Sequence, residues 1–222
     1  MIHALAALLL ATGGALAGPV AQVAHGPLAD RLPGVMDFEA LPLLPEPGAA
    51  LDGLISVPGL AIGERFAGQS VQGAPHDALS GAPSAPLALM AGAPRASLST
   101  AYHPGFGSAA LFPLGPAGFP DIAARGEGAV ALLFPRDVAA LALKIHAEYP
   151  DPLGTRPPPG RALIRFYARD GALLDTHEIA LETGVLALGF RGAPFAGVTI
   201  TNDDPGGLAI DDIRFPLDAL TG

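Results

Sequence analysis

The chain of 222 residues contains no cysteine, no tryptophan and a single lysine, Lys144. Without cysteine it forms neither disulfides nor cysteine-ligated metal centres, and catalysis by a thiol is excluded. Acidic residues outnumber basic ones, and the formal net charge is −9. Such a surface repels nucleic acid and anionic lipid, so neither is expected as a partner.

The sequence also has little that would form long helices. It contains 29 glycines and 24 prolines, which helices tolerate badly but which short strands joined by turns use well. The hydrophobic fraction of 50% is too high for a disordered chain. The composition therefore predicts an all-β protein with a substantial core.

The first residues are interpreted as a cleavable signal peptide, residues 1–17. An apolar run at Leu5–Ala11 is followed by small residues at Ala15 and Ala17, a pattern that suits a signal peptidase. The run is shorter than the roughly 20 residues that span a bilayer as a helix. We therefore expect export to the periplasm or the extracellular space.

Behind this segment, residues 18–34 are expected to be an irregular lead-in and residues 35–217 a single domain. No apolar tail follows Phe215, so we expect a secreted monomer without a membrane anchor. One all-β domain of this length is common.

Short apolar segments separated by turn residues predict the strands of this domain. The expected strands are 35–41, 54–57, 64–71, 129–134, 138–147, 161–168, 173–180, 185–190, 195–201 and a last strand that ends at Phe215. Asp170-Gly171 predicts a tight hairpin between two of them. This regular alternation of strand and turn indicates an antiparallel β-sandwich. Residues 73–107 are expected to be loops around one or two weak strands, forming a flap over one end.

The last strand carries two adjacent carboxylates, Asp211 and Asp212, where strands normally avoid aspartate. Regular alternation puts Asp211 on the side of Ile213 and Asp212 on the side of Ile210, unless a bulge intervenes. A charge that is covered on such a strand needs a metal ion, an arginine or backbone donors.

Both ends of the predicted domain resemble a known group of proteins. Asp37-Phe38-Glu39 near the start and Ile210-Asp211-Asp212-Ile213 at the finish are similar to secreted bacterial jelly-roll domains. These include galactose-binding-like carbohydrate-binding modules and uncharacterised exported proteins that often carry C-terminal sorting signals. The resemblance implies a β-sandwich whose first and last strands lie close together.

The resemblance also implies a structural Ca²⁺ held by Glu39, Asp211 and Asp212. Calcium takes six to eight oxygen ligands, so three carboxylates supply part of a site. The alternative is that the aspartates accept backbone hydrogen bonds or pair with arginine, for which Arg65 and Arg214 are available.

No arrangement of residues predicts catalysis. There is no G-x-S-x-G motif, and His177-Glu178 lacks the second histidine of a zinc protease. His76, Asp77 and His103 are interpreted as loop residues in solvent. We therefore expect a non-enzymatic binding or interaction domain at the cell surface or in the extracellular matrix. The alternative is a carbohydrate-binding module with a structural calcium, and an extracellular hydrolase is the remote one.

The expected partner is an extracellular surface protein or a glycan. Sugar sites usually present flat aromatic rings, and this chain has only three tyrosines. Tyr149 adjoins the proline-rich stretch at 150–160, and Tyr102 lies in the expected flap. These two tyrosines are the candidate ligand-binding residues.

Overall fold

The computed structural model describes residues 20–147 and 158–217. This part of the chain consists mainly of strands, with one short helix, α1 (His25–Ala29), and one 3-10 turn, η1 (Ile122–Ala124). The strands are β1 (Ala21–Val23), β2 (Gly34–Met36), β3 (Ala49–Leu51), β4 (Ile55–Val57), β5 (Leu60–Gly63), β6 (Arg65–Phe66), β7 (Ser70–Gln72), β8 (Ala78–Ser80), β9 (Leu89–Met90), β10 (Leu98–His103), β11 (Ser108–Pro113), β12 (Val130–His146), β13 (Arg161–Tyr167), β14 (Leu173–Ala180), β15 (Val185–Asn202) and β16 (Ala209–Phe215). The pairings among them are antiparallel, so the all-β prediction is confirmed. The segment 1–17 lies outside the described residues.

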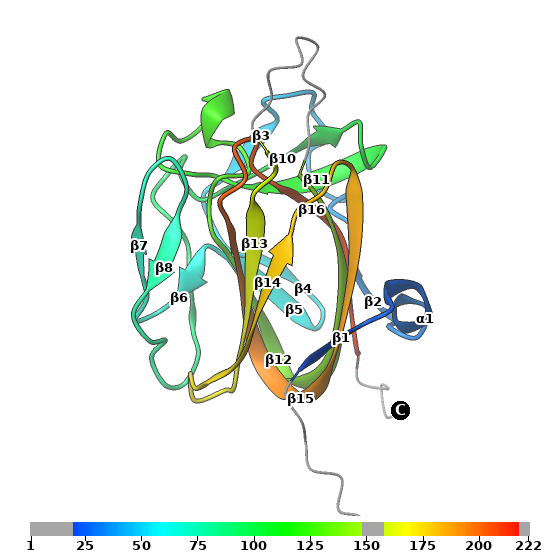
Figure 1. Cartoon of the computed structure of the whole chain (residues 1–222). Helices are drawn as coiled ribbons and strands as arrows, with labels where there is room; N and C mark the ends of the chain where they lie inside the picture. The colour runs from blue at the N-terminus through cyan, green and yellow to red at the C-terminus, as the bar shows by residue number, and fades with distance from the viewer. Residues whose placement is uncertain (1–19, 148–157, 218–222) are drawn as a thin grey trace, which may run out of the picture.

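Two long strands, β12 and β15, organise the fold. They pair with each other from Val130↔Ile200 to His146↔Val185, with register shifts between Leu133 and Ala140. Figure 1 shows both strands curving together at the lower end of the molecule. Strands that bend at bulges pass from one layer of a sandwich to the other. The four strands predicted at 129–134, 138–147, 185–190 and 195–201 are therefore the halves of two long ones.

Each half of the β12–β15 pair belongs to a different layer. The first layer has the order β14, β13, β15, β12, β5 and β4, using the C-terminal half of β15 and the N-terminal half of β12. The second layer has the order β1, β15, β12, β16, β11, β10 and β3, using the other two halves. The core lies between these layers, which gives a sandwich-like arrangement.

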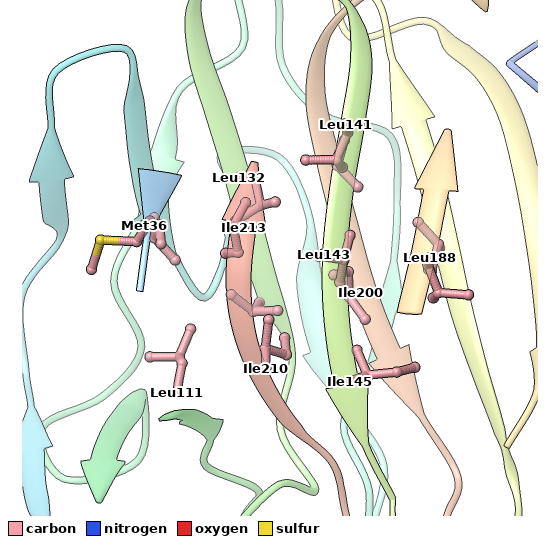
Figure 2. Close-up of a cluster of buried hydrophobic side chains, with 14 of the residues drawn as sticks. Met36, Leu111, Leu132, Leu141, Leu143, Ile145, Leu188, Ile200, Ile210 and Ile213 are labelled. Carbon is pink, nitrogen blue, oxygen red and sulfur yellow. The ribbon is translucent and has the colours of Figure 1, made fainter. Parts of the chain in front are cut away.

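Side-chain alternation along β12 follows this bend. Its core residues change from even to odd positions: Val130, Leu132 and Phe134 before the bend, and Leu141, Leu143 and Ile145 after it. The bulge supplies the extra residues that make this change possible. Figure 2 shows leucines and isoleucines of β12 packed against those of β15 and β16 in one buried cluster.

The hairpin predicted at Asp170-Gly171 is confirmed. β13 and β14 pair from Arg161↔Ala180 to Tyr167↔Leu173, and Gly171 has the positive φ of 85° that the turn requires. Local turn chemistry was enough to predict this element.

The expected adjacency of the first and last strands of the domain is also confirmed, because β2 pairs with β16 through Met36↔Ile213. β2 ends at Met36 and does not run on to Leu41. Phe38 takes a φ of 60°, which ends the extended chain, and its ring is fully buried.

Residues 20–34 contain regular structure where an irregular lead-in was expected. β1 pairs with β15, and α1 packs on the outer face of the second layer. Leu28 and Leu32 contact Ala140 and Ala142 there, because the small alanine side chains let the helix approach the sheet closely. This segment is therefore joined to the domain. No helix among the described residues is long and apolar enough to cross a membrane.

The expected flap at 73–107 is only partly loop. β10 and β11 pair along their whole length as strands of the second layer. The expected strand 64–71 is divided between β6, which pairs with β9, and β7, which pairs with β8. Phe66 and Leu87 from this region pack on Ala131 and Tyr167, so the segment covers the outer face of the first layer.

Candidate functional site

Asp211 and Asp212 lie at a bulge in β16. Ile210 and Ile213 are three positions apart, yet both are fully buried in the same cluster (Figure 2). Asp212 has a φ of 51°, and the register with β12 shifts at this point. The extra residue puts both carboxylates on the outer face, which is the bulged arrangement that the sequence left open.

Donors within the protein engage both carboxylates. The hydroxyl of Ser108 donates to Oδ2 of Asp211 over 2.7 Å, and the backbone N–H of Asp212 donates to Oδ1 of Asp211 over 2.6 Å. Lys144 Nζ lies 2.9 Å from Oδ2 of Asp212, and Arg214 pairs with its other oxygen. The pair is thus neutralised by hydrogen bonds and two cations.

The pKa values of the two aspartates shift in opposite directions in this environment. Burial raises the pKa of Asp211, because few charges compensate its carboxylate. Burial also acts to raise the pKa of Asp212, but the hydrogen bonds and charges of Lys144 and Arg214 outweigh it and lower that pKa. Asp212 therefore stays ionised more readily than Asp211.

Glu39 comes to the same region from the turn after β2. Its Oε1 accepts a 2.7 Å hydrogen bond from the backbone N–H of Ala109, next to Ser108. Glu39 and Asp211 therefore both contact the start of β11, whereas Asp212 is engaged by Lys144 and Arg214. Within residues 20–147 and 158–217, no group of three or more His, Asp or Glu side chains has the arrangement of a metal site. The calcium stays a prediction, and the contacts present are those of the alternative.

A cavity of about 350 Å³ adjoins the acidic pair. Its polar walls come from Asp37, Ser108, Lys144, Asp211, Asp212 and Arg214. The contacts above already engage Lys144, Asp211, Asp212 and Arg214, and Oδ1 of Asp37 accepts a 3.3 Å hydrogen bond from the backbone N–H of Glu39. This cavity therefore has little unused binding capacity.

The predicted tyrosine site is not assembled by the described residues. Tyr102 is exposed on β10, and Tyr149 lies outside the described part of the chain. The third tyrosine, Tyr167, is buried, and its hydroxyl accepts a hydrogen bond from the amide of Gln69.

A larger cavity, which the sequence did not predict, lies beside the short strands β6 and β7. It has a volume of about 540 Å³ and is lined by residues of 64–73, by Asp77 and by the segments 93–96 and 114–116. We call it the Glu64–Asp77 cleft, after its two carboxylates. Glu64 and Asp77 are each 4% exposed, which is unusual for acidic residues.

The chain around the cleft holds both carboxylates in place. Glu64 directly precedes β6, and Phe66 of β6 is buried in the apolar cluster with Ala131 and Tyr167. Oε2 of Glu64 pairs with Arg65. Asp77 directly precedes β8 and is held through its backbone N–H, which donates to the carbonyl of Glu127 over 2.8 Å. Its Oδ2 accepts a 3.3 Å hydrogen bond from the N–H of Ala129.

Each carboxylate keeps one oxygen without a partner. Among the described residues, Oε1 of Glu64 and Oδ1 of Asp77 accept no hydrogen bond. Neither oxygen is among the fully buried side-chain atoms that lack a partner in the described part of the chain, so solvent reaches both in the cleft and a ligand donor could bind them. The side chains of Ser70 and Gln72, which alternate onto one side of β7, likewise have no partner in this part of the chain.

Burial and charge repulsion raise the pKa values of the two carboxyl groups in the cleft. The pKa of Asp77 is raised to about 6, first by burial and then by the negative charge of Glu64. Burial raises the pKa of Glu64 as well, although Arg65 opposes it. Asp77 is therefore partly protonated near pH 6, whereas an ordinary aspartate would be ionised.

Two sequence interpretations are corrected by these findings. Asp77 is buried, and so is His103, which lies within β10; only His76 of that set is partly exposed. The ring nitrogen Nε2 of His76 lies 2.6 Å from the carbonyl oxygen of Asp204. The only sequence signal for the cleft was an Asp in a segment otherwise rich in glycine, alanine and proline.

Comparison with protein-family models, with curated proteins and with solved structures finds no match to this chain. The function is therefore argued from the geometry of the two cavities.

Proposed function

We propose that this protein is an exported, non-enzymatic binding module whose ligand site is the Glu64–Asp77 cleft. The observation that carries the proposal is the pair of buried carboxylates lining one cavity, each with an unpartnered oxygen. Two carboxylates that are mostly buried and line one cavity can together accept hydrogen bonds from a ligand that supplies donors.

The size of the cleft favours a small polar ligand over a protein surface. Its volume of about 540 Å³ falls within the roughly 300–1,000 Å³ range of small-molecule sites. Specific protein partners need a broad contact area of about 1,200 Å² or more, which a cavity does not provide.

The lining favours a ligand with several hydroxyl groups. Ser70 and Gln72 supply free donors and acceptors, and Glu64 and Asp77 supply deep acceptors. Val71 and Leu114 add apolar surface for the C–H groups of a sugar ring. None of the residues that line the cleft is aromatic, so hydrogen bonds would hold the sugar without ring stacking. An extracellular glycan is the ligand class that we propose.

The jelly-roll, galactose-binding-like assignment belongs to this proposal. It is supported by the sandwich-like layers and by the pairing of β2 with β16. Calcium at Glu39, Asp211 and Asp212, which the resemblance implies, is not part of this proposal, since binding in the Glu64–Asp77 cleft does not require it.

A glycan array followed by calorimetry on the full chain tests the proposed function. We expect binding that Asp77→Asn weakens and that Asp37→Asn, in the other cavity, leaves unchanged. Asparagine preserves the shape of the side chain, and its carbonyl oxygen can accept the hydrogen bond from the N–H of Ala129. We therefore expect the variant to fold. Absence of any sugar ligand, or equal binding by the Asp77 variant, would refute the site. Release of free sugar from a bound glycan would show that the protein is an enzyme.

A further inference from the structure

We infer that the Glu64–Asp77 cleft selects a sugar that carries a cationic amine, which binds between the two unpartnered carboxylate oxygens. This inference rests on the proposed function, because it names the ligand class of the same site.

The first step is the charge balance of the cleft. Glu64 is paired with Arg65, whose guanidinium also donates to the carbonyl of Gln69 over 3.2 Å and is thereby held in place. Among the described residues, Asp77 has no such partner, and its other charged neighbours are Glu127 and His76. The region therefore carries more negative than positive charge whenever Asp77 is ionised.

The second step is the match between donors and acceptors. A primary ammonium group has three N–H donors and one positive charge. Oε1 of Glu64 and Oδ1 of Asp77 offer two acceptors that no described residue uses. A hydroxyl group supplies one donor and no charge, so a neutral sugar satisfies the pair less well.

The third step separates an ammonium group from a metal ion. Calcium requires six to eight oxygen ligands, and two carboxylates with one free oxygen each are a small part of that set. The described residues contain no cluster of three acidic or histidine side chains suited to a metal. The donor set therefore favours an organic cation.

The fourth step places the sugar body. Ser70 and Gln72 lie on the exposed strand β7, whereas Glu64 and Asp77 are buried. An amine bound at the buried carboxylates leaves the ring hydroxyls near the free polar groups of β7. This arrangement distinguishes an amino sugar from a simple amine.

Binding of the cation is coupled to release of a proton from Asp77. The pKa of Asp77 is about 6 in the empty cleft, where burial and the charge of Glu64 favour the protonated form. A bound ammonium group lowers that pKa, so affinity increases as pH rises toward 6, and it decreases again where the amine of the ligand loses its own proton. Glu64, Glu127, Arg65 and His76 face the same region and shape this titration.

The experiment uses three disaccharides with the same linkage that differ only at C2. These are the β-1,4-linked disaccharides of glucosamine, N-acetylglucosamine and glucose, measured by calorimetry against the full chain at pH 4.5, 5.5 and 6.5. We expect the glucosamine disaccharide to bind about 10- to 100-fold more tightly than the other two at pH 6.5, from one charged hydrogen-bonded pair. We expect its affinity to fall about tenfold at pH 4.5, where most of Asp77 is protonated.

Variants distinguish the proposed function, which is sugar binding in the cleft, from the inference that the cleft prefers an amine. Asp77→Asn is expected to remove both the preference and the pH dependence, and Asp37→Asn to change neither. If all three sugars bind alike and Asp77→Asn weakens each, the cleft binds sugars but the amine preference is refuted. If none binds, the proposed function and the inference both fail.

Two further arms test the nature of the cation. Lysine methyl ester binding as tightly as the amino sugar would refute a role for the sugar body. Calcium alone, bound by the native chain but not by Asp77→Asn, would refute selection of an amine. A native pH profile measured without any variant covers the case in which Asp77→Asn fails to fold.

Discussion

Lys144 lies opposite Asp211 in the pairing of β12 with β16, yet its ammonium group is bound to the neighbouring carboxylate, that of Asp212. The bulge brings this about, because it turns Asp212 onto the same face as Lys144. In this arrangement the backbone of Asp212 is in the left-handed region, with a φ of 51°. The acidic pair thus combines an ion pair with local backbone strain.

Replacement of Asp212 separates these two effects. Asp212→Ala and Asp212→Gly both remove the contacts with Lys144 and Arg214. Glycine adopts the left-handed conformation without a Cβ clash, so we expect the glycine variant to be more stable by about 1 kcal/mol. Urea unfolding of both variants measures the difference. An alanine variant as stable as the glycine variant would mean that the backbone at this position relaxes freely.

Local sequence signals predicted the parts of this fold that depend on neighbouring residues. The β13–β14 hairpin follows from Asp170-Gly171, and the adjacency of β2 and β16 agrees with the resemblance of their sequences. The long strands were divided in the prediction, and Pro135 and Pro194 lie at the two divisions. A bend between layers tolerates proline, since strand irregularities leave some N–H groups unpaired.

Contacts between segments that are distant in the sequence determine the parts of the structure that the sequence did not predict. The residues of β10 and β11 are mostly small or polar, and they are strands because β3 and β16 flank them. The bulge at Asp212 and the cleft have no local signature either. Glu64 and Asp77 line one cavity together with segments 93–96 and 114–116, which only the folded chain brings together.

Stability should depend on pH through Asp77. Its folded pKa of about 6 lies above the ordinary value of 3.8, so the fold favours the protonated form. The stabilisation is fully present below pH 3.8 and is lost as pH rises through 6. Because each pKa unit corresponds to 1.36 kcal/mol, the change is at most about 3 kcal/mol.

The measurement is the urea-unfolding free energy of the native chain minus that of Asp77→Asn, from pH 4 to pH 8. Taking the difference cancels other groups, such as His103, whose pKa is lowered by burial to about 4 and which acts in the opposite direction. We expect the native chain to lose stability relative to the variant as pH rises. A difference that is independent of pH would contradict the raised pKa.

Metal removal tests the calcium prediction. Ser108, Ala109, Lys144 and Arg214 already engage the carboxylates of Glu39, Asp211 and Asp212. We therefore expect EDTA to leave the melting temperature unchanged. A tightly bound ion would stabilise the native state by mass action, so a clear decrease with EDTA, restored by Ca²⁺ and absent in Asp211→Asn, would establish the metal site.

Gly92 offers a way to close the Glu64–Asp77 cleft without changing a charge. A Cβ at this position would meet Oε1 of Glu64, and it would lie 2.8 Å from the carbonyl oxygen of Ala96. Because that carbonyl is backbone and cannot rotate away, Gly92→Ala is expected to displace both the Glu64 side chain and the segment 93–96. We expect loss of sugar binding and destabilisation of about 1–3 kcal/mol, as for other overpacked sites.

Gly53→Ala is the matched control for this closure, because a Cβ there meets nothing within 4 Å and neither glycine has a positive φ. The control should keep both stability and binding. Calorimetry with the glucosamine disaccharide and urea unfolding measure the two effects separately. If Gly92→Ala binds as well as the native chain, the unpartnered oxygen of Glu64 does not contact the ligand, and the site would have to be centred on Asp77 alone.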